Sequence, residues 1–202
     1  MSERTVTDGT APDTADTPDA PDPSGTARGQ RWSRHAPRLV AGIAVAVVAA
    51  DQLSKWWAES TLTRGERTPL LGDALGVQLI YNPGAALSIG AGATWIFTIV
   101  TAVGVLVGLW YAWRVRSRAW AVPLGLILGG ATTHLGDRLF REPSFGQGHV
   151  VDFIAYFDWF IGNVADIAIV VGAVLFLVLT WRGSTFRPEP DPGPAEPATG
   201  RP

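Results

Sequence analysis

The sequence contains no cysteine, a single methionine and only three histidines in 202 residues. The absence of cysteine excludes disulfide bonds, zinc–thiolate sites and a thiol nucleophile. Charged residues are also scarce, at 17% of the chain with a formal net charge of −2, and the arginines stand in short clusters between apolar runs. Because nucleic-acid binding needs a basic face, we expect no nucleic-acid partner.

Charge is least frequent in the middle of the chain. Of the 18 acidic residues, six lie in the first 22 positions and three lie at or beyond Glu189. We predict that residues 1–29 form a disordered acidic tail and residues 183–202 a disordered proline-rich tail, because neither has enough apolar residues to offset the entropy of ordering. The first segment is not expected to be a cleavable signal peptide, since the first apolar run begins only at Leu39. Residues 30–182 remain as the folded domain.

Four apolar stretches of this domain have about the 20 residues that a helix needs to cross a bilayer. They cover about residues 38–57, 94–113, 119–136 and 159–181. Nine lysines and arginines flank one side of this frame and five flank the other, and the positive-inside rule then places both termini in the cytoplasm. The sequence therefore predicts an all-α membrane protein with four transmembrane helices.

Both loops on the outer side of this frame are rich in apolar residues. Residues 58–93 contain GVQLIYNPGAALSIG, whose partial alternation and β-branched residues predict a small extracytoplasmic β-element. Residues 138–158 contain FGQGHVVDFIAYFD, whose aromatic and aliphatic content predicts partial insertion at the membrane interface. We expect both loops to be structured.

Three acidic residues fall within or at the ends of the apolar stretches, where a carboxylate is costly and points to function. In the predicted topology, Asp51, Asp137 and Asp166 all lie toward the outer leaflet. Two carboxylates that face each other in a dry site divide into a charged base and a protonated acid, which can activate a water without a metal. We interpret Asp137 and Asp166 as this pair. The plainer alternative is structural pairing, of Asp137 with Arg138 or Lys55 and of Asp166 with Asn163 or a backbone amide.

Other chemistries have weaker support in the residues. His134 and Asp137 are three apart and could both bind a metal, but no cysteine and no nearby histidine completes a site. We therefore expect neither metal nor cofactor. Serine catalysis lacks an evident histidine or lysine partner, and a lipid-processing enzyme would need a different arrangement of acids. A non-enzymatic four-span scaffold that binds lipid or peptide remains an alternative.

Five short motifs follow one another along the four-span frame. They are D-Q-x-x-K at 51–55, N-x-G-A-A at 82–86, G-G-A followed by D-R at 129–138, G-x-V-x-D-F at 148–153 and N-x-A-D at 163–166. Together and in this order they resemble the lipoprotein signal peptidase family, also called signal peptidase II, over about residues 39–181.

The resemblance implies a fold, a location and a reaction. The fold would be a four-helix bundle of the bacterial cytoplasmic membrane, with a small extracytoplasmic β-element and an interfacial helix over a site that lies toward the outer leaflet. The substrates would be prolipoproteins whose cysteine already carries diacylglycerol, cut just before that cysteine. The other expected partner is membrane lipid, and we expect the protein to be a monomer.

The resemblance also implies roles for individual residues. Asp137 and Asp166 would activate the water. The predicted substrate-binding and supporting residues are Asp51, Lys55, Asn82, Gly84, His134, Arg138, Asn163 and Ala165.

Four positions depart from the family pattern. Thr133 and His134 replace a glycine and an asparagine, and Leu87 and Gly162 each replace a phenylalanine. A histidine adds volume and a group that titrates near neutral pH. We therefore expect an active enzyme with an altered pH dependence or substrate preference, and the alternative is a divergent paralogue with weak or specialised activity.

Overall fold

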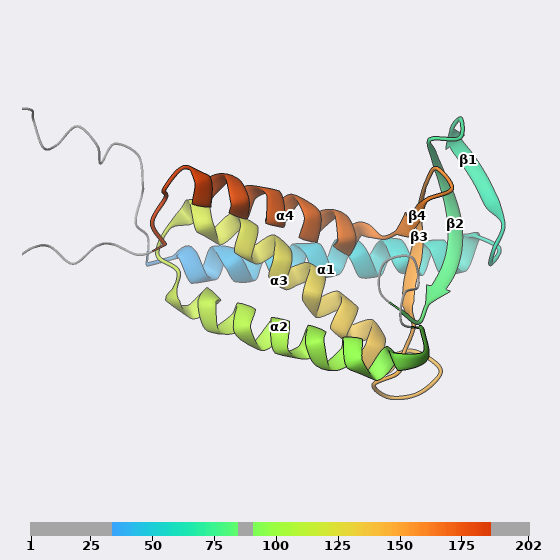
Figure 1. Ribbon diagram of the computed structural model, residues 1–202, viewed down its shortest axis with the longest axis horizontal. Helices are drawn as coiled ribbons and strands as arrows, with labels where there is room; N and C mark the ends of the chain where they lie inside the picture. Colours follow the sequence, from blue (N-terminus) through green and yellow to red (C-terminus); the bar gives the residue numbers. More distant parts are fainter. Residues whose placement is uncertain (1–33, 85–90, 187–202) are drawn as a thin grey trace, which may run out of the picture.

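The computed structural model describes residues 34–84 and 91–186, which form a helical bundle with a β-sheet at one end (Figure 1). The helices are α1 (Ala36–Thr61), α2 (Thr94–Arg114), α3 (Arg118–Phe140) and α4 (Val164–Trp181), with a short 3-10 turn, η3 (Ala91–Ala93), before α2. The strands are β1 (Arg67–Leu71), β2 (Leu75–Asn82), β3 (Val150–Tyr156) and β4 (Phe160–Gly162). By length and composition, α1, α2 and α4 are able to cross a membrane.

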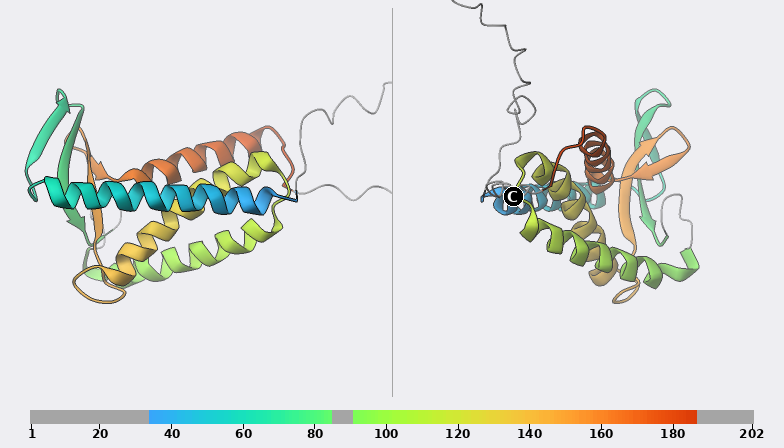
Figure 2. Two further views of the ribbon diagram at one scale, coloured as in Figure 1. Left: turned by 180° about the vertical axis from the view of Figure 1, so that it is seen from behind. Right: turned by 60° about the vertical axis from the view of Figure 1, so that its left-hand side comes forward.

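Helix α3 lies at the centre of the bundle and packs against each of the other three helices. It crosses the bundle diagonally, while α1 begins and α4 ends at the bundle end opposite the sheet (Figure 2). Two glycines permit the close approach. A Cβ at Gly129 would lie 2.8 Å from the Cβ of Val47 in α1, and a Cβ at Gly130 would lie 2.8 Å from the carbonyl oxygen of Ala165 in α4. This is the small-residue packing typical of helices in lipid.

The sheet is antiparallel throughout, in the order β1-β2-β3-β4. The first outer loop supplies β1 and β2, as the sequence predicts. The second outer loop supplies β3, which pairs with β2 so that Asn82 lies opposite Val150. This loop therefore extends the sheet, where the sequence analysis expected an interfacial segment, because VVDFIAY combines β-branched residues with a free strand edge on β2. The sheet closes one end of the bundle (Figure 1).

The end of the second outer loop also differs from the predicted boundary. The fourth apolar stretch was predicted to begin at residue 159, but Phe160–Gly162 pairs with β3 as strand β4, and α4 begins only at Val164. Asp166 consequently lies in the first turn of α4, whereas a helix that began at residue 159 would have placed it about two turns from its start.

Several predicted features lie partly or wholly outside the described residues. These include the N-terminal tail at 1–29, residues 187–202 of the C-terminal tail and residues 85–90 of the first outer loop. Within 34–84 and 91–186, no α-helix beyond the four is present to serve as the predicted interfacial helix. Phe186, which the sequence analysis assigned to the tail, packs its ring edge-on against Tyr111 and Trp120, so the ordered fold extends to this residue.

Candidate functional site

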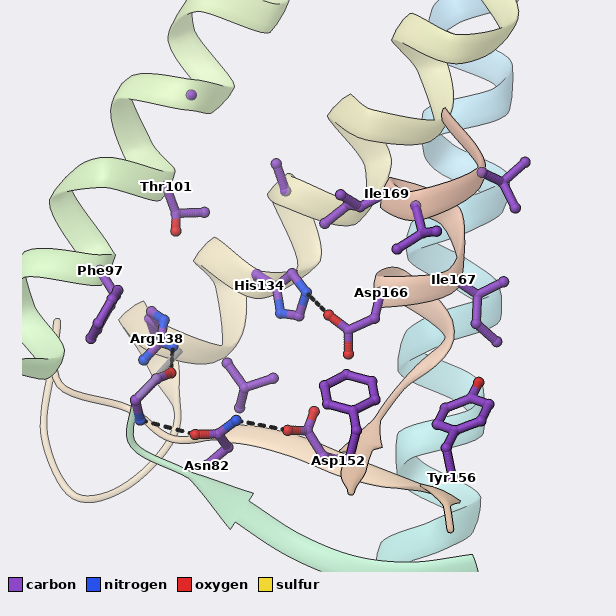
Figure 3. A pocket seen from close by; sticks show the side chains of 17 residues that line it. Asn82, Phe97, Thr101, His134, Arg138, Asp152, Tyr156, Asp166, Ile167 and Ile169 are labelled. Carbon is purple, nitrogen blue, oxygen red and sulfur yellow. Dashed lines mark hydrogen bonds and ion pairs between the residues drawn. The ribbon is translucent and has the colours of Figure 1, made fainter. Parts of the chain in front are cut away.

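A cavity of about 770 Å³ opens between α2, α3 and α4, directly beside the sheet (Figure 3). Its lining is polar next to the sheet and apolar along the helices. The polar lining residues near the sheet are Asn82, His134, Arg138, Asp152 and Asp166. The apolar ones include Phe97, Ala131, Ile167, Ile169, Val170 and Val171.

Two aspartates share the polar part of this cavity, and one asparagine holds both of them. The Nδ2 of Asn163 donates to Oδ1 of Asp152 over 2.6 Å, and its Oδ1 accepts from the backbone nitrogen of Asp166 over 3.1 Å. Asn163 itself is fully buried between β4 and α4. The start of the last helix therefore sets the relative position of Asp152 and Asp166.

Asp152 is the more deeply buried of the two, with 2% of its surface exposed. It reaches the cavity from β3, and Nδ2 of Asn82 donates to its Oδ2 over 3.0 Å. Burial and the nearby charge of Asp166 raise the pKa of Asp152 to about 6, against the lowering effect of the amide donors of Asn82 and Asn163 and of His134. This carboxyl therefore keeps its proton to a higher pH than an ordinary aspartate does.

Asp166 has a different environment, since 30% of its side chain is exposed. Its Oδ2 accepts from the backbone nitrogen of Asn163 over 2.9 Å, which completes a capping box at the start of α4. Its Oδ1 lies 3.1 Å from Nε2 of His134. Both neighbours can donate a hydrogen bond, so each oxygen of Asp166 has a partner, and the first turn of a helix is a position that suits an acidic side chain.

Asn82 and Arg138 order the turn that leaves the sheet toward the cavity. The Oδ1 of Asn82 accepts from the backbone nitrogen of Gly84 over 3.0 Å. The guanidinium of Arg138 donates to the carbonyl oxygens of Pro83 and Gly84 and lies over the ring of Phe97. These contacts join β2, α3 and α2 around the mouth of the polar region.

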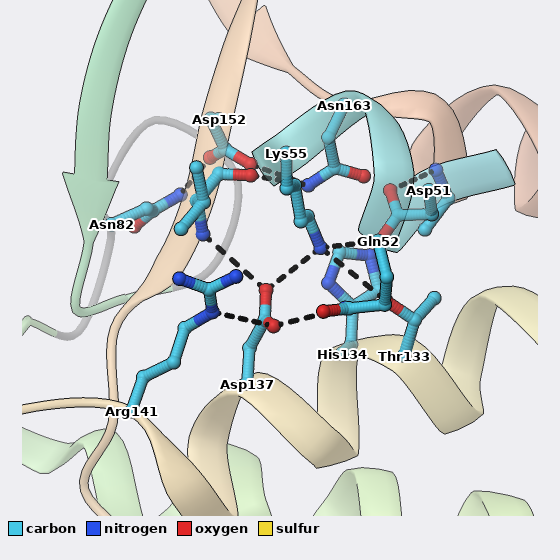
Figure 4. Close-up of polar contacts among 12 residues, drawn as sticks. Asp51, Gln52, Lys55, Asn82, Thr133, His134, Asp137, Arg141, Asp152 and Asn163 are labelled. Atoms are coloured by element: carbon cyan, nitrogen blue, oxygen red, sulfur yellow. Dashed lines mark hydrogen bonds and ion pairs between the residues drawn. The ribbon is translucent and has the colours of Figure 1, made fainter. Parts of the chain in front are cut away.

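Asp137 lies in a separate, buried cluster between α1 and α3 (Figure 4). The Nζ of Lys55 lies 2.7 Å from its Oδ2, and Nε of Arg141 lies 2.8 Å from its Oδ1. Gln52 donates to the same Oδ1 over 3.2 Å. Asp137 is 2% exposed and is not among the residues that line the described cavity. Two cations thus pair with Asp137, and one of them is Lys55, the partner weighed from the sequence as the plainer alternative.

Asp51 belongs to the same cluster and connects it to α4. Its Oδ2 lies 2.6 Å from Nζ of Lys55, and its Oδ1 accepts from the backbone nitrogen of Ala165 over 2.9 Å. The hydroxyl of Thr133 donates to Asp51 and accepts from Gln52. The cluster therefore supports the helix start that carries Asp166.

The predicted site residues thus separate into two groups. The cavity brings together Asn82, Gly84, His134, Arg138 and Asp166, with Asn163 behind them, and the buried cluster holds Asp51, Lys55, Asp137 and the backbone of Ala165. The structure does not pair Asp137 with Asp166. It places Asp152 there instead, a residue that the sequence analysis quoted within G-x-V-x-D-F but assigned no role.

His134 and Asp137, which were weighed together as metal ligands, also have different neighbours. His134 contacts Asp166, whereas Asp137 contacts Lys55. Over the described ranges, no group of three or more histidine, aspartate or glutamate side chains is arranged to hold a metal ion.

Comparison with known proteins places this arrangement in a family. A family model described as signal peptidase (SPase) II matches residues 43–182. A lipoprotein signal peptidase of Leifsonia xyli subsp. xyli is 50% identical over 147 residues, which cover 72% of this chain and 68% of the relative. One of Rhodococcus jostii is 45% identical over 184 residues, covering 90% and 92%.

Solved structures agree with the fold. A bacterial membrane enzyme superposes with a TM-score of 0.66 at 24% identity, over 81% of this chain and 98% of that one. A second one superposes with a TM-score of 0.62 at 25% identity, over 74% and 96%. This chain is accordingly a multi-pass bacterial membrane protein. The family predicted from the five motifs is confirmed: the chain belongs to the signal peptidase II family of aspartic peptidases.

Proposed function

We propose that this chain is a lipoprotein signal peptidase in which Asp152 and Asp166, and not Asp137, form the acid–base pair. The observation that carries this proposal is the shared cavity wall on which Asn163 holds both side chains. Asp137 is less suited to the role because Lys55 and Arg141 already occupy its oxygens.

In this mechanism Asp166 is the base and Asp152 is the acid. Asp166 takes a proton from a water whose oxygen bonds to the scissile carbonyl carbon, while Asp152 donates its proton to the carbonyl oxygen. The resulting diol collapses when Asp166 passes its proton to the leaving nitrogen and Asp152 recovers a proton from one hydroxyl. The carbon–nitrogen bond breaks in this step, and both aspartates return to their starting states. The raised pKa of Asp152 supports its role as the acid.

The proposed substrates are prolipoproteins that carry diacylglycerol on the cysteine after the cleavage site. The shape of the cavity supports this, because its apolar part runs along α2 and α4 and suits an apolar signal-peptide helix or acyl chains. Asn82 and Arg138 lie beside the aspartates with Gly84, where a substrate backbone would pass. These residues are proposed to hold that backbone.

We further propose that all four helices span the membrane, with the sheet outside and both termini in the cytoplasm. Helix α3 has 23 residues, or about 34 Å at 1.5 Å per residue, which is enough to span. Its lower hydropathy fits a helix that its three neighbours shield from lipid. Arginines gather at the end away from the sheet, at the start of α1, between α2 and α3 and after α4, whereas Lys55 and Arg141 near the sheet form ion pairs with acids. The positive-inside rule supports this orientation.

The test is cleavage of a diacylglyceryl-modified prolipoprotein by purified protein in liposomes. We expect Asp152→Asn and Asp166→Asn each to lower kcat/KM by about 10²–10⁴-fold, the usual contribution of acid–base groups. The matched control is Asp158→Asn, which changes an aspartate that is 92% exposed at the tip of the β3–β4 hairpin and should keep full activity. The unmodified prolipoprotein should not be cut.

Asp137→Asn separates the two assignments. Normalised to the amount of folded enzyme, this variant should retain most of its activity, although it should yield less folded protein. A folded Asp152→Asn enzyme that cleaves within about tenfold of the native rate would overturn the proposed pair. Cleavage of the unmodified prolipoprotein at the same rate would overturn the proposed substrate.

A further inference from the structure

His134 contacts one of the proposed catalytic carboxylates directly. Its Nε2 lies 3.1 Å from Oδ1 of Asp166, and the side chains are 17% and 30% exposed. Both line the cavity, and Figure 3 shows the imidazole pointing from α3 toward the carboxylate on α4. Because a carboxylate only accepts hydrogen bonds, the imidazole carries a proton on Nε2 whenever Asp166 is ionised.

The position of His134 on one face of α3 explains why its side chain reaches the cavity. Ala131, His134 and Arg138 follow the spacing of three and four that defines one helical face, and all three line the cavity. Thr133 and Asp137 lie on a different face, toward the cluster with Lys55. The imidazole is therefore held on the cavity side by the same packing that buries the polar cluster.

His134 is the described partner of Oδ1 of Asp166, while Oδ2 accepts from the backbone nitrogen of Asn163. The backbone contact on Oδ2 belongs to the helix cap and is independent of pH. The contact on Oδ1 uses a side chain whose free form titrates near pH 6.5. One oxygen of the proposed base is thus held by a side chain that is able to carry a second proton and a positive charge.

The other charged and titratable groups around this contact come from three elements: Asp152 and Tyr156 of β3, Arg138 of α3, and Asp51 with Lys55 of α1. The part of α2 that lines the cavity contributes the uncharged Phe97 and Thr101. Arg138 donates to the carbonyl oxygens of Pro83 and Gly84, and Lys55 is paired with Asp51 and Asp137. Among these cations, the imidazole is the one in contact with Asp166.

We propose that His134 is a positioning residue of the aspartate pair, which orients Asp166 through Oδ1 and, when protonated, extends cleavage to lower pH. This inference rests on the proposed function of Asp152 and Asp166. An imidazolium beside the pair favours the state in which one aspartate is ionised, and this is the state that the reaction needs. Above neutral pH only the hydrogen bond remains, so the benefit of the charge is confined to acidic conditions.

The experiment compares kcat/KM between pH 5 and pH 8 for three enzymes. His134→Gln keeps an amide donor near the position of Nε2 without a titrating group. It should stay within about threefold of native at pH 7.5 and fall to about a tenth of native at pH 5, mainly through kcat. His134→Leu removes the donor as well and should lose activity at every pH. The control Thr132→Val changes an exposed residue of the same helix and should match the native profile.

Two kinetic results would overturn the inference. One is a His134→Gln profile that parallels the native profile across the whole range, and the other is a rise in KM that is independent of pH, as expected of a residue that only contacts substrate. A readout without cleavage is the titration of the His134 imidazole resonance by NMR, which should change when Asp166 is replaced by Asn. An unchanged titration also overturns the inference, whereas absence of cleavage by the native protein at any pH rejects the proposed function.

Discussion

Replacing Asp152 by Asn should change how the stability of the protein responds to pH. The pKa of the Asp152 carboxyl rises from 3.8 to about 6, chiefly through burial. At 1.36 kcal/mol per pH unit, this difference corresponds to about 3 kcal/mol. Because the folded state binds this proton more tightly than the unfolded chain, stability is present at low pH and is lost as the pH rises through about 6. The Asn variant has no such loss.

The assay is thermal unfolding in detergent between pH 4 and pH 7.5, followed by tryptophan fluorescence. The quantity of interest is the difference in Tm between the variant and the native protein at each pH, since the titration of other groups is common to both. That difference should move in favour of the variant by roughly 6–12 °C across the range, which is about 3 kcal/mol for a chain of this size. A decrease in the Tm of the variant that does not depend on pH is expected as well. The amide introduced at position 152 would face the amide donors of Asn82 and Asn163.

The control is again Asp158→Asn, whose side chain is exposed and should show no such movement. A difference in Tm between Asp152→Asn and native that stays constant from pH 4 to pH 7.5 would refute the reasoning. Asp152 would then titrate like an exposed carboxyl, and the case for it as the acid would fail.

Two further substitutions test the support around the pair. Lys55→Met leaves the buried Asp51 and Asp137 without their shared cation, so it should lower the free energy of unfolding by about 3–5 kcal/mol. A Tm close to native would show that the cluster does not depend on the lysine. Gly162→Ala puts a Cβ 2.7 Å from Oδ2 of Asp166 and 2.7 Å from the ring of Phe160. Both contacts are with the ends of side chains, so the fold should tolerate the substitution. The cleavage rate should fall by up to about 10²-fold, because the carboxylate of Asp166 has to move. An unchanged cleavage rate in folded Gly162→Ala would contradict this position for Asp166.

The helical frame could be predicted from sequence because the length and hydropathy of a span are local properties. The stretches at 94–113 and 119–136 lie within α2 and α3, and the positions of Asn82, Asn163 and Asp166 follow from short motifs. The start of α4 could not be predicted from hydropathy, since Phe160–Gly162 is apolar whether it enters a helix or pairs with β3.

The choice among the aspartates was the harder problem. In a helix with 3.6 residues per turn, moving along by one residue rotates the side chain by about 100°, so Asp137 and Arg138 face different neighbours. Which of them meets the cavity depends on how α1 packs, and hydropathy alone does not reveal this. One signal was available in the sequence: Lys55, within an apolar helix, needs an acidic partner, and Asp137 provides it.

Asp152 was assigned no role from the sequence for a related reason. Its segment was interpreted as an interfacial loop, although V-V-D-F-I-A-Y has the β-branched content of a strand. Only the pairing of β3 with β2 brings this carboxyl next to Asn82 and below the sheet. An acid within an apolar strand segment therefore indicates a candidate site residue in the same way as an acid within an apolar helix.

The cap that Asn163 forms on α4 also bears on when the enzyme becomes active during its synthesis. Asp152 leaves the ribosome before Asn163 and Asp166, and neither its amide partner on α4 nor its carboxylate neighbour exists until that helix is made. A nascent chain with three helices inserted therefore holds half of the proposed pair, with Asn82 but without Asn163 to orient it. Proteolytic competence would then appear in a single step, when the fourth helix enters the membrane.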